Sequence, residues 1–328
     1  MKIEVNTHSK NMIRFAKEHE NAVVMSADLG TSCEVKEFHR LLPERYFSMG
    51  IAEQNMVSWA AGLAREGFLP YLHTFGVFLY RRVLDQLEMS VAYSNLPVTF
   101  VGFLPGIMTP GGVTHQAVDD IAAIRAVPNM TIFDVGDATD IESVLDLGYE
   151  VGGPVFIRML RKEVPRLFPA EEKMVFNRAR TLSEGSDIAI LSSSICTEEA
   201  MRATAVLHEK GVSIQHLHVS TIKPFTDPTV TEALGKVKYG AVTIENHLVT
   251  GGLGTAVAEV IADNGLNTKL ARVGINGYAH GASKMYLMKK YGLDAMSLIH
   301  AVESIMGTRF DIKEEDLAEV RFEDYSAV

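Results

Sequence analysis

Ser48-Met-Gly-Ile-Ala-Glu-Gln-Asn-Met-Val-Ser-Trp-Ala-Ala-Gly62 is the stretch around which this chain is organised, because its pattern is that of a tight turn at Gly50 followed by a helix. The spacing of one apolar helical face is shared by Met56, Trp59, Ala60 and Leu63. Glu53 precedes Met56 by three residues and is predicted to project from the same face. Loss of water around such a carboxylate favours its protonated form, which can donate a hydrogen bond. The alternative is that Glu53 lies in the first helical turn and complements the helix macrodipole.

Composition limits the class of protein. The 328 residues, 47% of them hydrophobic, suit two domains with a core each. A formal net charge of −10 argues against nucleic acid or an anionic membrane surface as a partner. The two cysteines, Cys33 and Cys196, are far apart and fit a reducing compartment. No signal peptide and no apolar run of about 18 residues is present, so we predict a cytoplasmic protein without a membrane span.

Helices and strands are predicted to alternate through the first half of the chain. We expect strands at 22–27, 45–48, 69–74, 97–103, 130–134 and 154–159. Helices are expected at 10–19 and 35–42, from Glu53 onward, and at 118–126 and 138–149. A further helix is expected to start near Phe75 and to run to about Tyr93. This pattern implies an α/β fold with a mostly parallel, doubly wound sheet. Ligand sites in such sheets lie at the carboxyl ends of the strands.

Two polar loops follow predicted strands. Asp28-Leu-Gly-Thr-Ser32 comes after strand 22–27, and a Gly/Pro-rich loop from Leu104 to Gln116 comes after strand 97–103. A loop of this second kind, without apolar periodicity, is more often functional than not. His115 near its end is a candidate general acid or base, or a hydrogen-bond donor to substrate. Alternatively, His115 caps the helix that begins near Val118.

Three further side chains are candidates in the first half. Phe75 and Phe78 lie three residues apart at a predicted helix start, where core packing is the commoner role for an aromatic pair. Arg158 closes a strand and is predicted to point toward the crevice at the strand ends. The other cations between 160 and 185 are expected on a solvated surface.

The second half repeats the α/β pattern. We predict a first domain over 1–160, a linker over 161–185, and a second domain over 186–328 whose acidic tail beyond 307 is peripheral. Strands are expected at 187–192, 212–217, 240–245 and 268–273, and helices at 197–210, 228–237, 253–264, 282–290 and 295–306. Gly251-Gly-Leu-Gly254 opens a helix and is only a weak phosphate-binding signal, since such glycines usually allow close packing. Glu245-Asn-His247 at a strand end is a candidate polar cluster.

Several segments, taken together, resemble the transketolase family. They are Ser26-Ala-Asp-Leu-Gly30, Gly50-Ile-Ala-Glu-Gln54, Thr74-Phe75, Thr114-His-Gln-Ala-Val-Asp-Asp120, Lys223-Pro-Phe225, and Glu245-Asn-His247 followed by Gly251-Gly-Leu-Gly254. The resemblance runs nearly end to end and implies a doubly wound pyrimidine-binding domain followed by a transketolase C-terminal α/β domain.

The family's diphosphate-binding motif, Gly-Asp-Gly followed by Asn, does not occur in this sequence. The resemblance therefore implies the C-terminal subunit of a split, two-chain transketolase, which moves a two-carbon ketol unit from a ketose phosphate to an aldose phosphate. An N-terminal partner subunit would carry Gly-Asp-Gly…Asn and hold most of the thiamine diphosphate with its Mg²⁺ or Ca²⁺. No metal ligand is predicted in this chain, and a heterotetramer with two copies of each subunit is expected.

The same resemblance assigns roles to individual residues. Glu53 matches the catalytic glutamate that hydrogen-bonds the aminopyrimidine of the cofactor, and His115 matches a histidine that contacts substrate oxygens. Phe75 and Phe78 match positions that line the pyrimidine. In the loop after strand 22–27, Asp28 matches a residue that reaches the cofactor, and Ser32 matches a residue that reaches the substrate. Arg158 matches an arginine that binds the substrate phosphate, a task suited to a guanidinium.

Departures from the family pattern concern the substrate. Phe103 stands where a histidine is expected, and Gly111 stands where an aspartate binds a sugar hydroxyl. An arginine near the amino terminus is replaced at Asn6 or Thr7. Loss of a buried hydrogen-bonded pair costs about 1–3 kcal/mol of recognition. We therefore expect a substrate other than ordinary pentose phosphates, such as a branched or otherwise modified sugar phosphate.

Three alternatives share some of these features. The beta subunit of a 2-oxoacid dehydrogenase first component has a similar length and the Gly50-Ile-Ala-Glu-Gln54 motif, but usually differs at Thr114-His-Gln116. Deoxyxylulose-phosphate synthase shares both domains but is normally one long chain. A noncatalytic subunit that only scaffolds a thiamine enzyme would not need Glu53, Phe75, His115 or Arg158.

Overall fold

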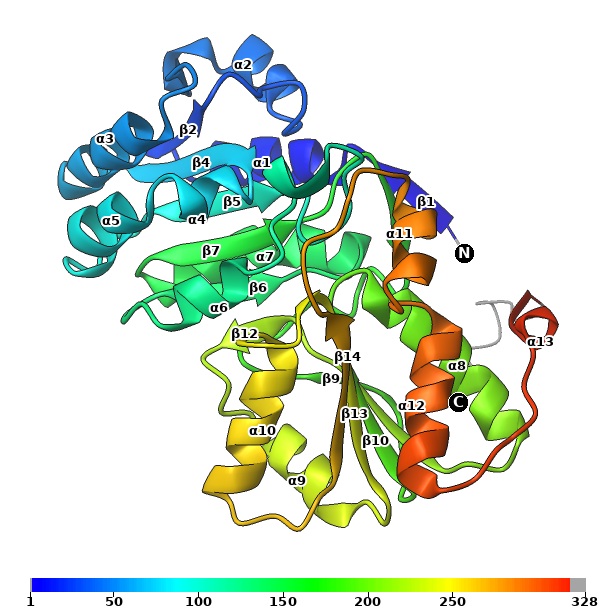
Figure 1. The fold of residues 1–328 in the computed structure, drawn as a ribbon. Coiled ribbons are helices and arrows are strands. Elements are labelled where there is room, and N and C mark those ends of the chain that lie inside the picture. The colour runs from blue at the N-terminus through cyan, green and yellow to red at the C-terminus, as the bar shows by residue number, and fades with distance from the viewer. Residues whose placement is uncertain (1, 319–328) are drawn as a thin grey trace.

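The computed structural model describes residues 2–318. Figure 1 shows two α/β units stacked on each other, each built on its own twisted sheet. Among the described residues, no helix is both long and apolar enough to cross a membrane.

The first sheet has seven strands in the order β12, β6, β7, β5, β4, β2, β3. Their bounds are Thr221–Lys223, Thr131–Asp134, Val155–Met159, Thr99–Phe103, Leu69–Phe75, Ala22–Ser26 and Tyr46–Ser48, respectively. Neighbouring strands are parallel except β12, which is antiparallel to β6. The mostly parallel sheet predicted from the sequence is thereby confirmed.

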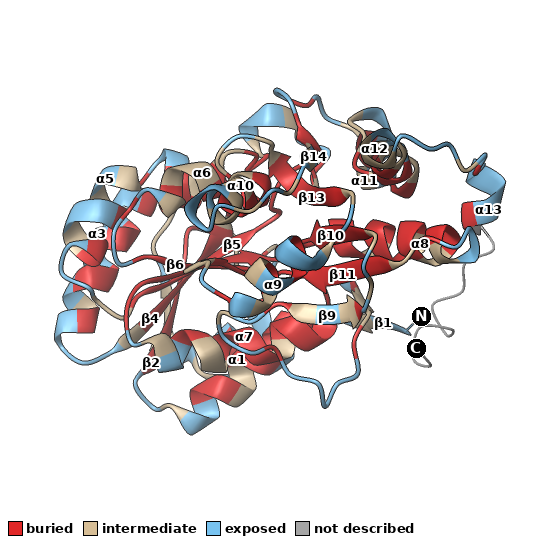
Figure 2. Cartoon of the chain, turned by 90° about the horizontal axis from the view of Figure 1, so that it is seen from below, coloured by how far each residue is buried: buried red, intermediate tan, exposed pale blue. Residues whose placement is uncertain are grey.

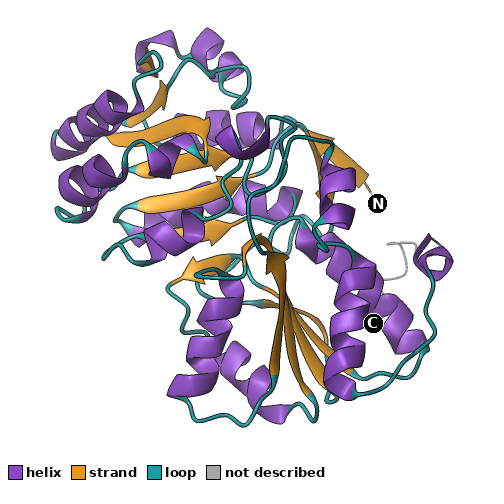
Figure 3. Ribbon diagram, in the orientation of Figure 1, coloured by secondary structure: helices purple, strands orange, loops and turns teal. Residues whose placement is uncertain are grey.

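Helices cover both faces of this sheet (Figure 3). One face carries α1 (Thr7–Glu18) and α7 (Ala138–Val151), and α2 (Lys36–Leu41) packs on α1. The other carries α3 (Glu53–Arg65), α4 (Phe78–Arg81), α5 (Leu84–Gln86), the π-helical segment Leu87–Ala92 and α6 (Asp120–Arg125). Successive strand residues point to opposite faces, so Val24 enters the core beneath α1 and Met25 the core beneath α3. Both faces are apolar, which explains the continuous hydrophobic runs of these strands.

The second sheet has five strands in the order β14, β13, β10, β11, β9. Their bounds are Leu270–Ile275, Gly240–Leu248, Ile188–Ser192, Ile214–His218 and Arg180–Ser183, and only β9 runs antiparallel. On one face lie α8 (Cys196–Glu209) and α12 (Ala295–Met306), and on the other α9 (Pro228–Lys236) and α10 (Leu253–Asp263). Two short helices, α11 (Lys284–Lys290) and α13 (Glu314–Ala318), complete this unit. Figure 2 shows that the buried residues run through the strands of both sheets.

Short polar strands depart from the sequence prediction. The predicted linker 161–185 contains β8 (Glu163–Arg166), which pairs with β1 (Lys2–Val5), and also contains β9. Strand β12 was not predicted, and it joins the first sheet although it follows strands of the second. The domain boundaries at 160 and 186 therefore stay a prediction. Residues 319–328 of the acidic tail lie outside the described residues, and in the described part Leu317 of α13 is buried.

The helix of the opening stretch buries only part of the predicted face, including Glu53. Met56 and Ala60 are fully buried, but Trp59 is 54% exposed. Val57, Ala61 and Ala64 complete the buried face instead. Small residues there let α3 lie close to the sheet, which turns the bulky indole outward.

Candidate active site

The carboxyl ends of five adjacent parallel strands bring together most of the predicted site residues. The strands lie in the order β7, β5, β4, β2, β3. Glu53 follows β3, Ser32 follows β2, Phe75 ends β4 and His115 lies in the loop after β5. Because the strands are parallel, their carboxyl ends share one edge of the sheet, where ligands bind in folds of this type.

Glu53 is the first residue of α3 and its side chain is only 4% exposed. The turn before it uses Gly50 with φ of 70°, a conformation that favours glycine. Nη1 of Arg82 donates a hydrogen bond to Oε1 of Glu53 at 2.6 Å. The same guanidinium lies over the ring of Phe78, with Cζ 3.8 Å from the ring centroid. Glu53 therefore has both surroundings that the sequence left open, since its side chain is buried and it lies in the first turn of α3.

Phe75, Phe78 and His115 form an aromatic cluster next to this ion pair. The two phenylalanine centroids are 5.9 Å apart. His115 meets both rings edge-on, at 6.1 Å from Phe75 and 5.6 Å from Phe78. Its Nδ1 lies 2.8 Å from Oγ1 of Thr114. All three rings are half-buried rather than enclosed in the core, so they form a wall that a ligand can reach.

Arg161 joins the same cluster, although the sequence did not single it out. Its Nη1 donates a hydrogen bond to the carbonyl oxygen of Ser32 at 3.0 Å. Its guanidinium lies 5.5 Å from the centroid of the Phe75 ring. The side chain is half-buried, and its position just beyond β7 places a cation at the strand-end edge.

Arg158 does not occupy the position that the resemblance implied. Its side chain is fully buried, its Nε donates to Oδ2 of Asp120 at 2.8 Å, and its Nη1 lies 2.9 Å from Oδ1 of Asp134. Burial opposes the charge on Arg158, but the two carboxylates outweigh it and raise the pKa of the guanidinium. The role of Arg158 in binding substrate phosphate stays a prediction, which this arrangement does not favour because the guanidinium is fully buried and paired with two carboxylates.

Asp28 lies at the margin of the site. It is exposed, has φ of 58°, and lines a cavity of about 350 Å³ with Ser32, Tyr46 and Ser48. Glu53 and the aromatic cluster do not line this cavity. Ser32 is therefore the predicted residue that links the two groups, through its contact with Arg161.

The two departures from the family pattern lie at the end of β5 and in the loop from Leu104 to Gln116, which we call the substrate loop. Phe103 is fully buried and packs edge-on against His8, with ring centroids 5.3 Å apart, so it offers no polar group to a ligand. A Cβ atom added at Gly111 would lie 2.9 Å from Cβ and Cγ of His115. The loop is thus shaped around the imidazole and has no room for a side chain at 111 unless His115 moves.

Sequence reasoning missed Arg82 and Arg161 for different reasons. Arg82 lies four residues after Phe78, a spacing that places both on one helical face, and this signal was available. Arg161 was passed over in favour of Arg158, although position 158 is inside a strand whose two faces are both covered. Among the described residues, no group of three or more His, Cys, Asp or Glu side chains is arranged to hold a metal ion.

Comparison with known proteins places this architecture in one family. The model of the transketolase pyrimidine binding domain matches residues 5–166, and that of the transketolase C-terminal domain matches residues 177–298. A protein of Methanocaldococcus jannaschii, provisionally named a transketolase C-terminal section, is 38% identical over 295 residues, covering 89% of this chain and 92% of that protein. The chain therefore belongs to the transketolase family.

Two further similar proteins have names that describe a transketolase subunit and a split-gene transketolase. The 6-deoxy-6-sulfo-D-fructose transketolase subunit SqwH of Clostridium sp. (strain MSTE9) is 35% identical and covers 92% of this chain and 93% of its own. A solved structure described as a split gene transketolase, inactive beta4 tetramer, superposes with a TM-score of 0.85 at 33% identity. That match covers 92% of this chain and 97% of the other.

Proposed function

We propose that this chain is the C-terminal subunit of a thiamine-diphosphate-dependent transketolase whose active site is shared with a second polypeptide. The observation that carries the proposal is the position of the Arg82 guanidinium, which lies over the Phe78 ring and donates to the Glu53 carboxylate. We call the place that this planar group occupies the slot. A flat, nitrogen-bearing group therefore fits between these two residues, and an aminopyrimidine has that shape and that chemistry.

The cofactor, when bound, supplies a carbon nucleophile that takes a two-carbon unit from a ketose and passes it to an aldehyde. Glu53 would hold a proton against a ring nitrogen from its buried position at the start of α3. Phe75 and Phe78 would pack against the ring and exclude water. Arg82 must leave the slot for this to happen, and its side chain, 43% exposed, has solvent to move into.

The substrate would lie over the other half of the cluster. We assign His115 the role of donating or accepting a proton at substrate oxygens, because its imidazole lies at the wall of the site. Arg161, in place of Arg158, would bind an anionic end of the sugar, together with the Ser32 loop. Asp28 would reach the cofactor or substrate only after a movement of its loop.

A partner subunit with the Gly-Asp-Gly…Asn motif would hold the diphosphate and its metal ion, in a heterotetramer with two copies of each chain. The names of the relatives, one a C-terminal section and one a subunit, support this division. We expect transketolase turnover when this chain is mixed with that partner, thiamine diphosphate and Mg²⁺, and none from this chain alone. Turnover by the isolated chain would contradict the shared site, and acyl transfer from a 2-oxoacid to lipoamide would favour a 2-oxoacid dehydrogenase subunit.

The substrate is proposed to be a modified sugar phosphate or a similar anion. Phe103 and Gly111 remove two polar contacts, and the SqwH relative is named for a sulfonated ketose. Comparing kcat/KM for xylulose 5-phosphate, a branched ketose phosphate and 6-deoxy-6-sulfofructose tests this point. Ordinary transketolase efficiency with xylulose 5-phosphate and ribose 5-phosphate would overturn it.

Replacing Arg161 with methionine is expected to raise the KM for an anionic ketose about 10- to 100-fold. A charge-assisted hydrogen bond of about 1.5–3 kcal/mol is lost, while the methionine keeps contact with Phe75. Steady-state kinetics of the two-chain enzyme measure the change. Arg178→Met, at an exposed arginine, is the matched control. Equal KM values for the two variants would show that the anion binds elsewhere.

A further inference from the structure

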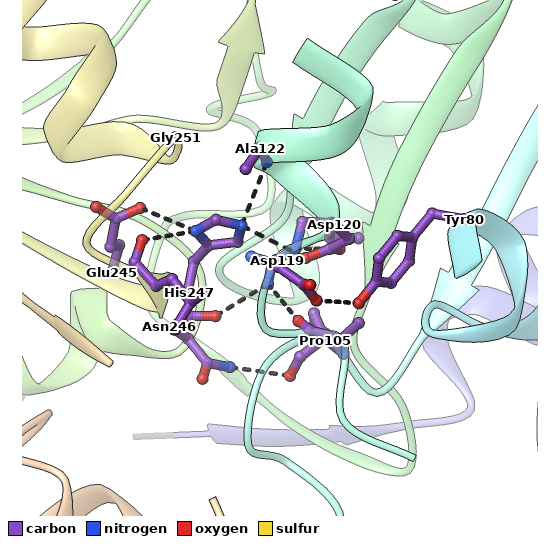
Figure 4. Close-up of polar contacts among 12 residues, drawn as sticks. Tyr80, Pro105, Asp119, Asp120, Ala122, Glu245, Asn246, His247 and Gly251 are labelled. Atoms are coloured by element: carbon purple, nitrogen blue, oxygen red, sulfur yellow. Dashed lines mark hydrogen bonds and ion pairs between the residues drawn. The ribbon is translucent and has the colours of Figure 1, made fainter. Parts of the chain in front are cut away.

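Asn246 and His247 lie near the end of β13 in the second sheet, yet both make polar contacts to the first unit (Figure 4). Asn246 is fully buried. Its Nδ2 donates to the carbonyl oxygen of Pro105 at 2.9 Å, and its Oδ1 accepts from the amide nitrogen of Ile107 at 3.0 Å. One side chain amide thus pairs with two points of the loop that follows β5, much as a neighbouring strand would.

The residue between those two points is shaped to receive this amide. Gly106 has φ of 60°, and a Cβ added there would lie 2.1 to 2.4 Å from the amide atoms of Asn246. Any side chain at 106 would therefore expel the amide. The close approach shows that the loop and Asn246 are fitted to each other rather than in chance contact.

Asn246 is itself held rigidly. Nη2 of Arg158 donates to its carbonyl oxygen at 2.9 Å, and that guanidinium is fixed by Asp120 and Asp134. Nε2 of the adjacent His247 accepts from the amide nitrogen of Ala122 at 3.4 Å. Burial lowers the pKa of His247 to about 3, so the ring is neutral and can accept this bond. Residues of both units of the chain therefore hold Asn246 in place.

The same loop is held again near its tip and its end. Nε2 of Gln116 donates to the carbonyl oxygens of Thr109 and His280, each at 3.3 Å. Nη1 of Arg81 donates to the carbonyl oxygen of Val113 at 3.0 Å. Asn246 is the buried contact at the beginning of the loop. The amide nitrogen of Gly106 there donates to the carbonyl oxygen of Ala117 at 2.7 Å, so the residue beside the Asn246 amide is paired directly with the loop end, two residues after His115.

We propose that Asn246 is a positioning residue, through which the C-terminal domain sets the conformation of the substrate loop and the place of His115. The effect on catalysis rests on the proposed function, while the effect on the loop does not. Fixing a loop residue in one conformation costs conformational entropy, and the paired amide offsets this cost for the loop start. A misplacement of about 1 Å in a reacting group can cost about 100-fold in rate.

The test uses Asn246→Ala and Asn246→Asp. Aspartate keeps the acceptor for the Ile107 amide but loses the donor to Pro105, and it preserves the side-chain volume. The control is Gln215→Ala, because Gln215 is also buried in the second sheet and its Oε1 accepts from Gly185 at 3.3 Å, away from the loop. Hydrogen exchange of the Ile107 amide and the ring resonances of His115 are measured on the full chain alone.

We expect the Ile107 amide to exchange at least tenfold faster in Asn246→Ala, which removes its acceptor. The His115 resonances should shift in both Asn246 variants, because both lose the donor to Pro105, while Gln215→Ala changes neither property. In the two-chain enzyme, kcat/KM for the ketose should fall about 10- to 100-fold with the affinity for thiamine diphosphate kept within twofold. Unchanged exchange and resonances overturn the proposal, as does a faster exchange with unaltered kcat/KM. Absence of turnover in the unmodified two-chain enzyme would remove the proposed function, and the exchange and resonance data would still decide the positioning role.

Discussion

Replacing Glu53 with glutamine is expected to lower kcat of the two-chain enzyme by about 100- to 10,000-fold, the range that proton transfer by a positioned side chain contributes. Glutamine preserves the volume and the hydrogen-bonding reach of the side chain at the start of α3. It cannot exchange a proton with a ring nitrogen. The measurement is turnover with saturating ketose, aldose and cofactor.

Glu66→Gln is the matched control, because Glu66 ends the same helix and is exposed. It should leave kcat within twofold. Cofactor affinity of Glu53→Gln is measured separately by quenching of protein fluorescence, since weaker binding alone would be cured by more cofactor. Unaltered turnover in Glu53→Gln would contradict the assignment and favour a noncatalytic scaffold subunit.

The fold was largely predictable because the central strands are buried on both faces. Runs such as Ala22–Ser26 and Thr99–Phe103 have no polar face, so their apolar character alone marks them as strands of a parallel sheet. The edge strands β8, β9 and β12 lack this signal. They are short and partly exposed, and they form because distant backbone groups need partners, which local sequence does not encode.

The aromatic part of the site was predictable for a related reason. Phe75 and His115 follow strands that are parallel neighbours, so their meeting follows from the sheet order. The partners of Arg158 could not be predicted in the same way. Asp120 begins α6 and Asp134 ends β6, and only the packed structure brings their carboxylates to one guanidinium. The sequence likewise marked Glu245-Asn-His247 as polar but did not indicate that Asn246 reaches across to Pro105.

Replacing Arg158 with methionine is expected to lower the free energy of unfolding by about 3–5 kcal/mol, because two buried carboxylates lose their counter-charge. Denaturant unfolding of the chain alone measures this change. Arg14→Met is the control, since Arg14 is 40% exposed and pairs with Glu18 and Asp146 at the surface. It should cost no more than about 1 kcal/mol.

A compensated variant separates lost charge from lost packing. Arg158→Met combined with Asp120→Asn and Asp134→Asn removes all three charges together and should recover much of the lost stability, because a neutral polar cluster carries a smaller desolvation cost than an unpaired carboxylate. If Arg158→Met instead unfolds like the unmodified chain and only the KM for an anionic ketose rises, Arg158 binds substrate after all. That result would require the buried guanidinium to be released from Asp120 and Asp134 when the partner subunit docks. Replacing Arg161 with methionine would then leave the KM for the anionic ketose unchanged.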